Sequence, residues 1–344
     1  MRRPADARQS NSGDTTSTLQ RADSRGADRW AIILAGGDGT RLRPLTRVIA
    51  GDERPKQFCA ILGEETLLGQ TRSRVALAVR PAQTLFVLTQ THEPFYESPL
   101  SDVPREHLVV QPKNAGTAPA ILYSLLRLSK AAPSSTVAFF PSDHYFSDDA
   151  AFMSYVESAF EAARERHDVI ILLGIKPEGP EGEYGWIEPI SPGLTTHTYA
   201  LCRVRRFWEK PTPEFARGLM ERGCLWNSFV MVGRVSAFLE IIRRASPDLF
   251  DRFNAVEPIL STSKEWSVMG ELYSQLHDVN FSQHVLAARP GNLAVLPVGG
   301  LTWSDLGKPQ RVLSTLAAIG LSPGAERCQA SASALKVTAN RHSL

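Results

Sequence analysis

The glycine-rich segment after the first apolar run has the composition of a site for an anion. It is the stretch Leu34-Ala-Gly-Gly-Asp-Gly-Thr-Arg-Leu-Arg-Pro-Leu-Thr46. Gly36, Gly37 and Gly39 let the backbone turn sharply, so that its N–H groups can approach an anion, and Arg41 can meet phosphate oxygens. The segment matches neither a dinucleotide fingerprint nor a Walker A loop. It predicts a phosphate-binding loop, with a tight strand exit as the structural alternative.

Basic residues downstream of this loop favour the phosphate interpretation. The segment Arg54-Pro-Lys-Gln57 adds two cationic side chains shortly after the glycines. A strand exit does not require such cations, whereas a phosphate group is bound well by them. We therefore expect the loop and this segment to lie on one site.

Two acidic residues follow apolar runs far apart in the chain. Asp143 stands in Phe140-Pro-Ser-Asp-His144, and Asp305 stands in Trp303-Ser-Asp-Leu-Gly307. A carboxylate at the carboxyl end of a parallel strand lies where open α/β sheets bind ligands. Each aspartate alone fits a turn or a helix cap equally well. The neighbouring His144 is given no catalytic role.

The elements that would position these residues alternate between strand and helix. Short apolar runs without alternation predict strands buried on both faces, at 30–35, 84–88, 136–140 and 169–173. Helical spacing of apolar residues lies between them, at 66–79, 117–130 and 149–163. This order predicts an α/β fold with right-handed crossovers.

The pattern changes after Gly174. Segments 182–188 and 202–209 predict antiparallel strands laid over the sheet, and a helix near 213–222 precedes a strand at 225–232. Residues 235–277 are mostly helical by pattern, followed by a strand at 292–298 and a helix at 309–319. There is no internal repeat and no hexapeptide array that would form a β-helix.

Composition limits the classes of function and the ordered region. Hydrophobic residues make 43% and charged residues 22% of the 344, as in ordinary globular proteins. Lys+Arg 38 against Asp+Glu 36 predicts no broad basic face for nucleic acid or membrane. The four cysteines form no C-x-x-C pair, so we expect a reduced, cytoplasmic protein. Polar composition predicts a disordered tail at 1–29, one domain at 30–320 and a short tail at 321–344, without a β-helix or cupin domain.

From Trp30 to about Ile319 the sequence resembles the sugar-1-phosphate nucleotidylyltransferases, most of all the mannose-1-phosphate guanylyltransferases (GDP-mannose pyrophosphorylases). The segments 34–46 and Pro55-Lys56-Gln57 carry the resemblance. It implies a Rossmann-like α/β fold: a mostly parallel central sheet flanked by helices, with a small antiparallel sugar-binding part. It also implies that a sugar 1-phosphate, expected to be mannose 1-phosphate, attacks the α-phosphorus of a nucleoside triphosphate, expected to be GTP, and releases pyrophosphate.

The resemblance also implies roles for individual residues. Nucleotide binding falls to Leu34, Ala35, Gly36, Gly37, Gly39, Thr40, Gln111, Asn114, Gly116, Thr117 and Ala118. The expected catalytic residues are Arg41, Lys56 and Lys210, which neutralise or position phosphates. Sugar phosphate binding falls to Gly185, Glu188, Glu209 and Asn227. Asp143 and Asp305 would hold Mg²⁺, which prefers oxygen ligands and bridges phosphates. From spacing alone, a plain helix cap is the favoured interpretation of Thr117.

Three features differ from the family pattern. Asn114 and Thr117 are separated by two residues, Phe229 stands where glycine is usual, and Ser282 stands where aspartate is expected. The last two changes fall on the sugar side, so the reaction type is better predicted than the sugar. The same chemistry on another triphosphate and sugar phosphate stays open, as does a catalytically silent sugar-nucleotide sensor. The expected partners are small molecules, without nucleic acid or membrane, and a homodimer stays open.

Overall fold

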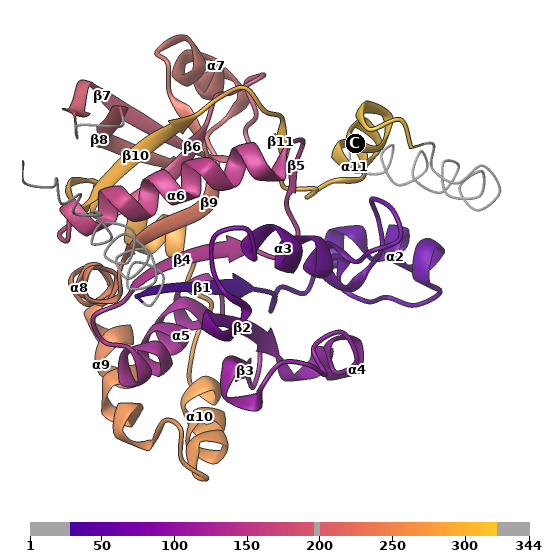
Figure 1. Ribbon diagram of the computed structural model, residues 1–344, viewed down its shortest axis with the longest axis vertical. Coiled ribbons are helices and arrows are strands. Elements are labelled where there is room, and N and C mark those ends of the chain that lie inside the picture. The colour runs from indigo at the N-terminus through magenta and orange to yellow at the C-terminus, as the bar shows by residue number, and fades with distance from the viewer. Residues whose placement is uncertain (1–27, 196–199, 322–344) are drawn as a thin grey trace, which may run out of the picture.

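The computed structural model describes residues 28–195 and 200–321. Within these residues a nine-stranded mixed sheet lies between helices, and a separate two-stranded sheet lies beside it (Figure 1). The α/β class expected from the alternation of strands and helices is therefore confirmed. The predicted tails at 1–29 and 321–344 lie outside the described residues except at their inner ends.

The strands occur close to the predicted apolar runs, and the pair β5–β11 is an addition to the prediction. Their bounds are β1 (Arg29–Leu34), β2 (Thr84–Thr89), β3 (Leu108–Gln111), β4 (Thr136–Pro141), β5 (Tyr145–Phe146), β6 (Ile170–Ile175), β7 (Gly185–Thr195), β8 (Ala200–Glu209), β9 (Leu225–Arg234), β10 (Leu293–Val298) and β11 (Trp303–Ser304).

Most of the helices follow the predicted pattern, and the two at residues 43–50 and 93–96 are additions to it. Their bounds are α2 (Arg43–Ala50), α3 (Leu67–Val75), α4 (Glu93–Tyr96), α5 (Thr117–Ala131), α6 (Asp149–Glu165), α7 (Pro213–Glu221), α8 (Val235–Ala245), α9 (Pro247–Val256), α10 (Glu265–Ser274) and α11 (Pro309–Ala318). Side-chain caps fix several of their starts: Asp148 accepts a hydrogen bond from the Ala151 amide at 2.8 Å, and Thr212 caps α7 similarly.

The strand order places a ligand site at the carboxyl ends of β1 and β4. Across the main sheet the order is β3-β2-β1-β4-β9-β6-β10-β8-β7, and β1 pairs in parallel with both β2 and β4. Because the chain leaves β1 toward β2 and later returns on the other side to β4, a crevice opens where the strand order reverses. The glycine-rich segment follows β1, and Asp143 follows β4.

The second half of the sheet is antiparallel where the sequence pattern changes. β9 runs antiparallel to β4 and β6, and β7 pairs antiparallel with β8 and with the start of β9. The predicted antiparallel strands are therefore part of the main sheet rather than a layer over it. The pairings β9–β6–β10–β8–β7–β9 form a closed ring, and β9 bulges where it passes from β4 to β7.

Both faces of the sheet are buried, as the apolar strands without alternation predict. On β1, Ile33 faces the cluster that contains Phe152 and Phe160 of α6, whereas Ile32 faces the cluster that contains Ile121 of α5. Figure 1 shows α6 across one face of the sheet, with α5, α8 and α9 on the other. No helix in the described part of the chain is long and apolar enough to cross a membrane.

Candidate active site

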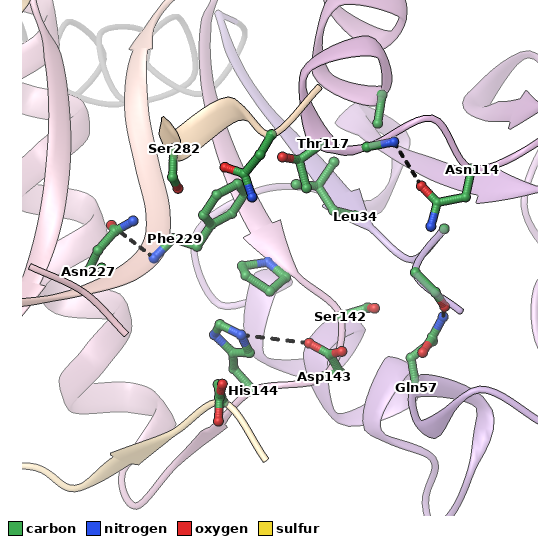
Figure 2. A pocket seen from close by; sticks show the side chains of 18 of the residues that line it. Leu34, Gln57, Asn114, Thr117, Ser142, Asp143, His144, Asn227, Phe229 and Ser282 are labelled. Atoms are coloured by element: carbon green, nitrogen blue, oxygen red, sulfur yellow. Dashed lines mark hydrogen bonds and ion pairs between the residues drawn. The ribbon is translucent and has the colours of Figure 1, made fainter. Parts of the chain in front are cut away.

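A pocket of about 470 Å³ lies at the carboxyl ends of β1 and β4. The glycine-rich loop, the start of α5 and the segment after α10 line it, together with the ends of β4, β8 and β9. Figure 2 shows Asn227 and Phe229 on one side of the pocket, Gln57 and Asn114 on the other, and Asp143 with His144 between them. Segments distant in the sequence thus converge on one cavity.

The structure brings most of the predicted site residues to this pocket. Those that line it are Leu34, Gly36, Gly37, Arg41, Gln111, Asn114, Gly116, Thr117, Asp143, Gly185, Glu209, Lys210, Asn227 and Asp305. Those that do not line it are Ala35, Gly39, Thr40, Lys56, Ala118 and Glu188. Of this second set, Ala35, Thr40, Lys56 and Ala118 each stand next to a lining residue in the chain, and Gly39 lies two residues from Gly37. Glu188 is the exception.

Hydrogen bonds from the side chains of Gln57 and Thr89 hold the glycine loop in place. The Gln57 amide donates to the carbonyl oxygens of Ala35 (2.9 Å) and Gly37 (2.8 Å), and the Thr89 hydroxyl donates to that of Gly36 at 2.9 Å. A Cβ on Gly36 would lie 2.7 Å from the Gln111 amide nitrogen, so this position has no room for a side chain. The loop is therefore held in one conformation before any ligand arrives.

The two aspartates meet because of the two-residue strands β5 and β11. Tyr145 pairs with Ser304, and Asp143 stands two residues before Tyr145 while Asp305 directly follows Ser304, so both aspartates line the same pocket. The Lys56 ammonium lies 3.4 Å from the Asp143 carboxylate and donates to the carbonyl oxygens of Asp305 and Leu306, at 2.5 and 3.1 Å. Lys56 is thus buried behind the two carboxylates and does not line the pocket. Its contacts hold the two aspartates in position.

Asp305 is held as an anion. Its Oδ1 accepts hydrogen bonds from the Arg311 guanidinium at 2.6 Å and from the Gly307 amide at 2.8 Å. Burial opposes ionisation, but Arg311, His144 and Lys56 together leave the pKa of Asp305 below its usual value. His144 is the opposite case, because burial lowers its pKa to about 4. The imidazole is neutral at neutral pH, and its Nδ1 accepts a hydrogen bond from the Trp303 indole at 3.3 Å.

This donor set suits Mg²⁺ when the ion also binds phosphate. Within the described residues no cluster of three or more acidic, histidine or cysteine ligands is present, so a metal held by protein alone is not supported. Mg²⁺ typically uses one or two carboxylates and completes its shell with waters and substrate phosphates. Asp143 and Asp305, on the wall of the pocket that the glycine loop also lines, fit that requirement.

At the start of α5, the segment after α10 is pinned over the pocket. The Ala118 amide donates to the Val279 carbonyl at 2.9 Å, the Val279 amide to the Ala115 carbonyl at 3.0 Å, and the Phe281 amide to the Thr117 hydroxyl at 2.8 Å. Thr117 therefore fastens a neighbouring segment instead of capping its own helix, whose N-cap position is Gly116. The two segments form one wall.

Gly116→Ala is expected to distort this wall. Gly116 has a φ of 90°, and an added Cβ would lie 2.6 Å from both the Asp278 carboxylate and the Val279 carbonyl oxygen. We expect the free energy of unfolding to fall by about 1–3 kcal/mol and the affinity of the pocket for a nucleoside triphosphate to fall as well. Urea unfolding and calorimetric titration measure both. Gly51→Ala is the matched control, because Gly51 has a φ of 83° but no described atom within 4 Å of the added Cβ. Equal effects in the two variants would contradict the argument from crowding.

Glu188 is the one predicted site residue that lies on the wrong face of its strand. Alternate residues of a strand point to opposite faces, so Gly185 and Glu188 cannot both face the pocket. Glu188 lines another depression, where it accepts a hydrogen bond from the Trp208 indole at 3.3 Å and lies 4.0 Å from Arg205. Its predicted contact with the sugar is therefore not supported.

Glu209 lies on β8 and faces the pocket. Its carboxyl group ionises less readily than that of a free glutamate. Burial raises its pKa, and the neighbouring Lys210 ammonium opposes this only in part. Because the folded-state pKa exceeds the unfolded one, the ionised carboxylate destabilises the fold at pH values above the unfolded pKa of about 4.3, and the effect is absent well below that pH.

Glu209→Gln is therefore expected to stabilise the protein at neutral pH and to leave its stability unchanged in acid. Urea unfolding at both pH values measures the difference. Glu221→Gln, an exposed position on α7, is the control and should change little at either pH. A Glu209→Gln variant that is less stable than the parent at neutral pH would contradict the burial argument.

Backbone strain collects around this pocket. Among the described non-glycine residues, positive φ occurs at Lys210 (46°), Phe229 (61°), Leu306 (48°) and Ser261 (66°). The first two line the pocket and Leu306 follows Asp305, whereas Ser261 does not line it. The left-handed conformation costs a side-chain-bearing residue roughly 1–2 kcal/mol. Strain of this kind persists where the surrounding structure enforces it, and it is frequent at functional sites.

Several pocket residues were not predicted from the sequence. They include Gln57, Glu183, Tyr184, Asp278, Asn280 and Trp303, with Arg311 behind them. Gln57 and Trp303 belong to segments that were singled out for other residues, so their motifs carried a signal. Arg311 lies on α11, where no sequence motif marks it as a site residue. Its contact with Asp305 depends on how α11 packs.

The family model described as nucleotidyl transferase matches residues 30–320 of this chain. The xanthan biosynthesis protein XanB of Xanthomonas campestris pv. campestris is 35% identical over 228 residues, which cover 65% of this chain and 46% of XanB. A mannose-1-phosphate guanylyltransferase of Escherichia coli is 28% identical over 287 residues, which cover 81% of this chain and 58% of that protein. The chain thus spans about half the length of these relatives.

A solved structure supports the same assignment. A Thermus thermophilus protein described as mannose-1-phosphate geranyltransferase superposes with a TM-score of 0.69 at 28% identity, covering 81% of this chain and 76% of its own. The match to the family model covers nearly all the described residues, including the glycine loop and both aspartates. The chain belongs to the nucleotidyl transferase family, among the sugar-phosphate nucleotidyltransferases.

Proposed function

We propose that this chain transfers a guanylyl group from GTP to mannose 1-phosphate and releases pyrophosphate. The observation that carries the proposal is the meeting of Asp143 and Asp305 on the wall of a pocket that also contains the glycine loop. A phosphate loop and two carboxylates are the groups needed to hold a triphosphate with its metal ion. The choice of guanine and mannose rests on the relative named mannose-1-phosphate guanylyltransferase in Escherichia coli.

The residues of the pocket have different roles in this reaction, according to their charge. The glycine loop, fixed by Gln57, presents its backbone to the triphosphate, and Arg41 neutralises charge on the phosphates from the pocket rim. Arg41 is able to do this because its side chain is largely exposed and, within the described residues, forms an ion pair with Glu183 alone, at 3.0 Å. Lys210 also lines the pocket, and in this proposal it orients the attacking phosphate of the sugar. Alignment and charge neutralisation suffice, since the phosphate oxygen is already a nucleophile.

Asp143 and Asp305 would hold Mg²⁺, which when bound supplies positive charge to the reacting phosphates. Lys56 keeps the two carboxylate-bearing segments together by contacting Asp143 and the backbone after β11. Its role is therefore to position the aspartates, in place of the direct phosphate contact expected from the sequence.

Pyrophosphate release from the purified chain tests the proposal. Each of the four ribonucleoside triphosphates and dTTP is offered with mannose, glucose, fucose and N-acetylglucosamine 1-phosphates, with Mg²⁺ and with a chelator. We expect turnover with GTP and mannose 1-phosphate that the chelator abolishes. Turnover confined to another pair would replace the substrates and keep the reaction. Tight binding of a sugar nucleotide without turnover on any pair would favour a sensor.

A further inference from the structure

Phe229 occupies a backbone position that favours glycine. It lies in a bulge of β9, where the register with β6 shifts between Leu172–Met231 and Gly174–Asn227. Its φ of 61° is left-handed, a region that β-bulges usually fill with glycine. A bulge turns a side chain out of its regular direction, and here the side chain lines the pocket.

Neighbouring side chains hold the bulge rigidly. The Asn227 side-chain carbonyl oxygen accepts a hydrogen bond from the Phe229 amide at 3.1 Å. The buried Ser228 hydroxyl donates to the Leu173 carbonyl at 2.7 Å and accepts from the Val230 amide at 3.2 Å. Because polar groups on both sides fix the backbone, Phe229 cannot relax without breaking them. The direction in which its side chain leaves the backbone is therefore set by the fold.

The ring forms an apolar wall inside a polar region. Figure 2 shows Phe229 between Asn227 on one side and Thr117 with Leu34 on the other, near Ser282. It is partly buried against the core that includes α5, so its position is supported from behind. Asn227, Glu209 and Gly185 line the same pocket and belong to the end expected to hold the sugar. The wall therefore limits the space between that end and the start of α5.

We propose that Phe229 is a specificity-determining residue that restricts the sugar 1-phosphate to one without a bulky substituent facing the ring. This inference rests on the proposed function and adds a selection rule to it: hexose 1-phosphates are accepted and N-acetylhexosamine 1-phosphates are rejected. A glycine would form the same bulge without strain, so the bulge alone does not explain a phenylalanine. The ring itself supplies what glycine lacks, which is volume in the pocket.

Phe229→Gly tests the rule, with binding and turnover measured separately. Calorimetric titration with mannose 1-phosphate and with N-acetylglucosamine 1-phosphate, in the presence of Mg²⁺ and a non-hydrolysable GTP analogue, gives the affinity ratio. Pyrophosphate release gives the ratio of kcat/KM for the same two sugars. We expect the preference for the hexose to fall about tenfold or more in the variant, as for other changes of pocket volume.

Two further variants separate the ring from the backbone strain. Ser261→Gly removes a left-handed serine, with φ 66°, at a position that does not line the pocket, and it should leave both ratios unchanged. Phe229→Tyr keeps the wall and should retain the parent selectivity.

Each outcome decides the inference independently of the proposed function. The inference is supported if the ratio of affinities for the two sugar 1-phosphates falls in Phe229→Gly alone. This holds even if the parent releases no pyrophosphate and the proposed function fails. The inference is refuted if a folded Phe229→Gly protein has the same affinity ratio as the parent, even if the parent turns over GTP and mannose 1-phosphate. A loss of selectivity in Phe229→Tyr, or the same shift in Ser261→Gly, would also overturn it.

Discussion

Asp143→Asn is expected to reduce turnover by about two to three orders of magnitude, the effect of removing one preorganised charged group from a transition state. Asparagine keeps the shape of the side chain and removes its charge from the pocket wall. The rest of the wall should persist, because Lys56 retains its hydrogen bonds to the carbonyl oxygens of Asp305 and Leu306. Initial rates of pyrophosphate release at saturating substrates measure the effect.

The control is Asp168→Asn, outside the pocket. Asp168 precedes β6, its side chain is 70% exposed, and it lies 3.1 Å from Arg166. Exposed ion pairs contribute at most about 1 kcal/mol, so this variant should retain the parent rate. The role of Asp143 would be refuted by a folded Asp143→Asn protein that keeps most of its activity at any Mg²⁺ concentration.

Arg311→Met is expected to lower the free energy of unfolding by about 3 kcal/mol, the lower end of the range for breaking a buried ion pair. The Arg311 guanidinium lies 2.6 Å from Asp305 and 2.9 Å from Glu181, and it also covers the Tyr184 ring. Its side chain is only 13% exposed. Methionine fills similar space but leaves these carboxylates without their cation, and this also frees the Asp305 side chain to move, so activity should fall with stability.

Arg164→Met is the matched control for this substitution. Arg164 is 47% exposed and lies 3.6 Å from Glu161 on the surface of α6, so its loss should cost no more than about 0.5 kcal/mol. Urea unfolding of both variants gives the comparison. Equal stability losses would mean that the charge cluster around Arg311 contributes nothing beyond a surface pair.

The parts of the site that depend on local pattern could be predicted from the sequence. The apolar runs at β1 and β4, the glycine loop and Asp143 all follow from residue types and spacing within one segment. The orientation of Glu188 could have been predicted in the same way. Because Glu188 is an odd number of residues from Gly185, the two cannot face the same side of a strand. The antiparallel strands were found as elements, whereas their place in the main sheet was not.

The parts that depend on packing do not follow from residue types and spacing, and the meeting of the two aspartates is expected only through the family resemblance. The strands β5 and β11 are two residues each, too short to carry a periodic pattern, yet their pairing is what brings Asp305 to Asp143. Lys56 was singled out for its charge, but only the fold shows that it is buried behind both aspartates. The left-handed backbone of Phe229 is also a property of the bulge, which forms from the pairing of β9 with β6.

The position of β10 has a consequence for how the protein is made. β10 lies inside the sheet, between β6 and β8, although it is nearly the last strand in the chain. During synthesis from the amino end, β6 and β8 therefore have open edges until residues 293–298 leave the ribosome. Open strand edges invite aggregation or chaperone binding. Asp305 follows β10 within a few residues, so the nascent chain closes its sheet and completes its acidic pair at nearly the same moment.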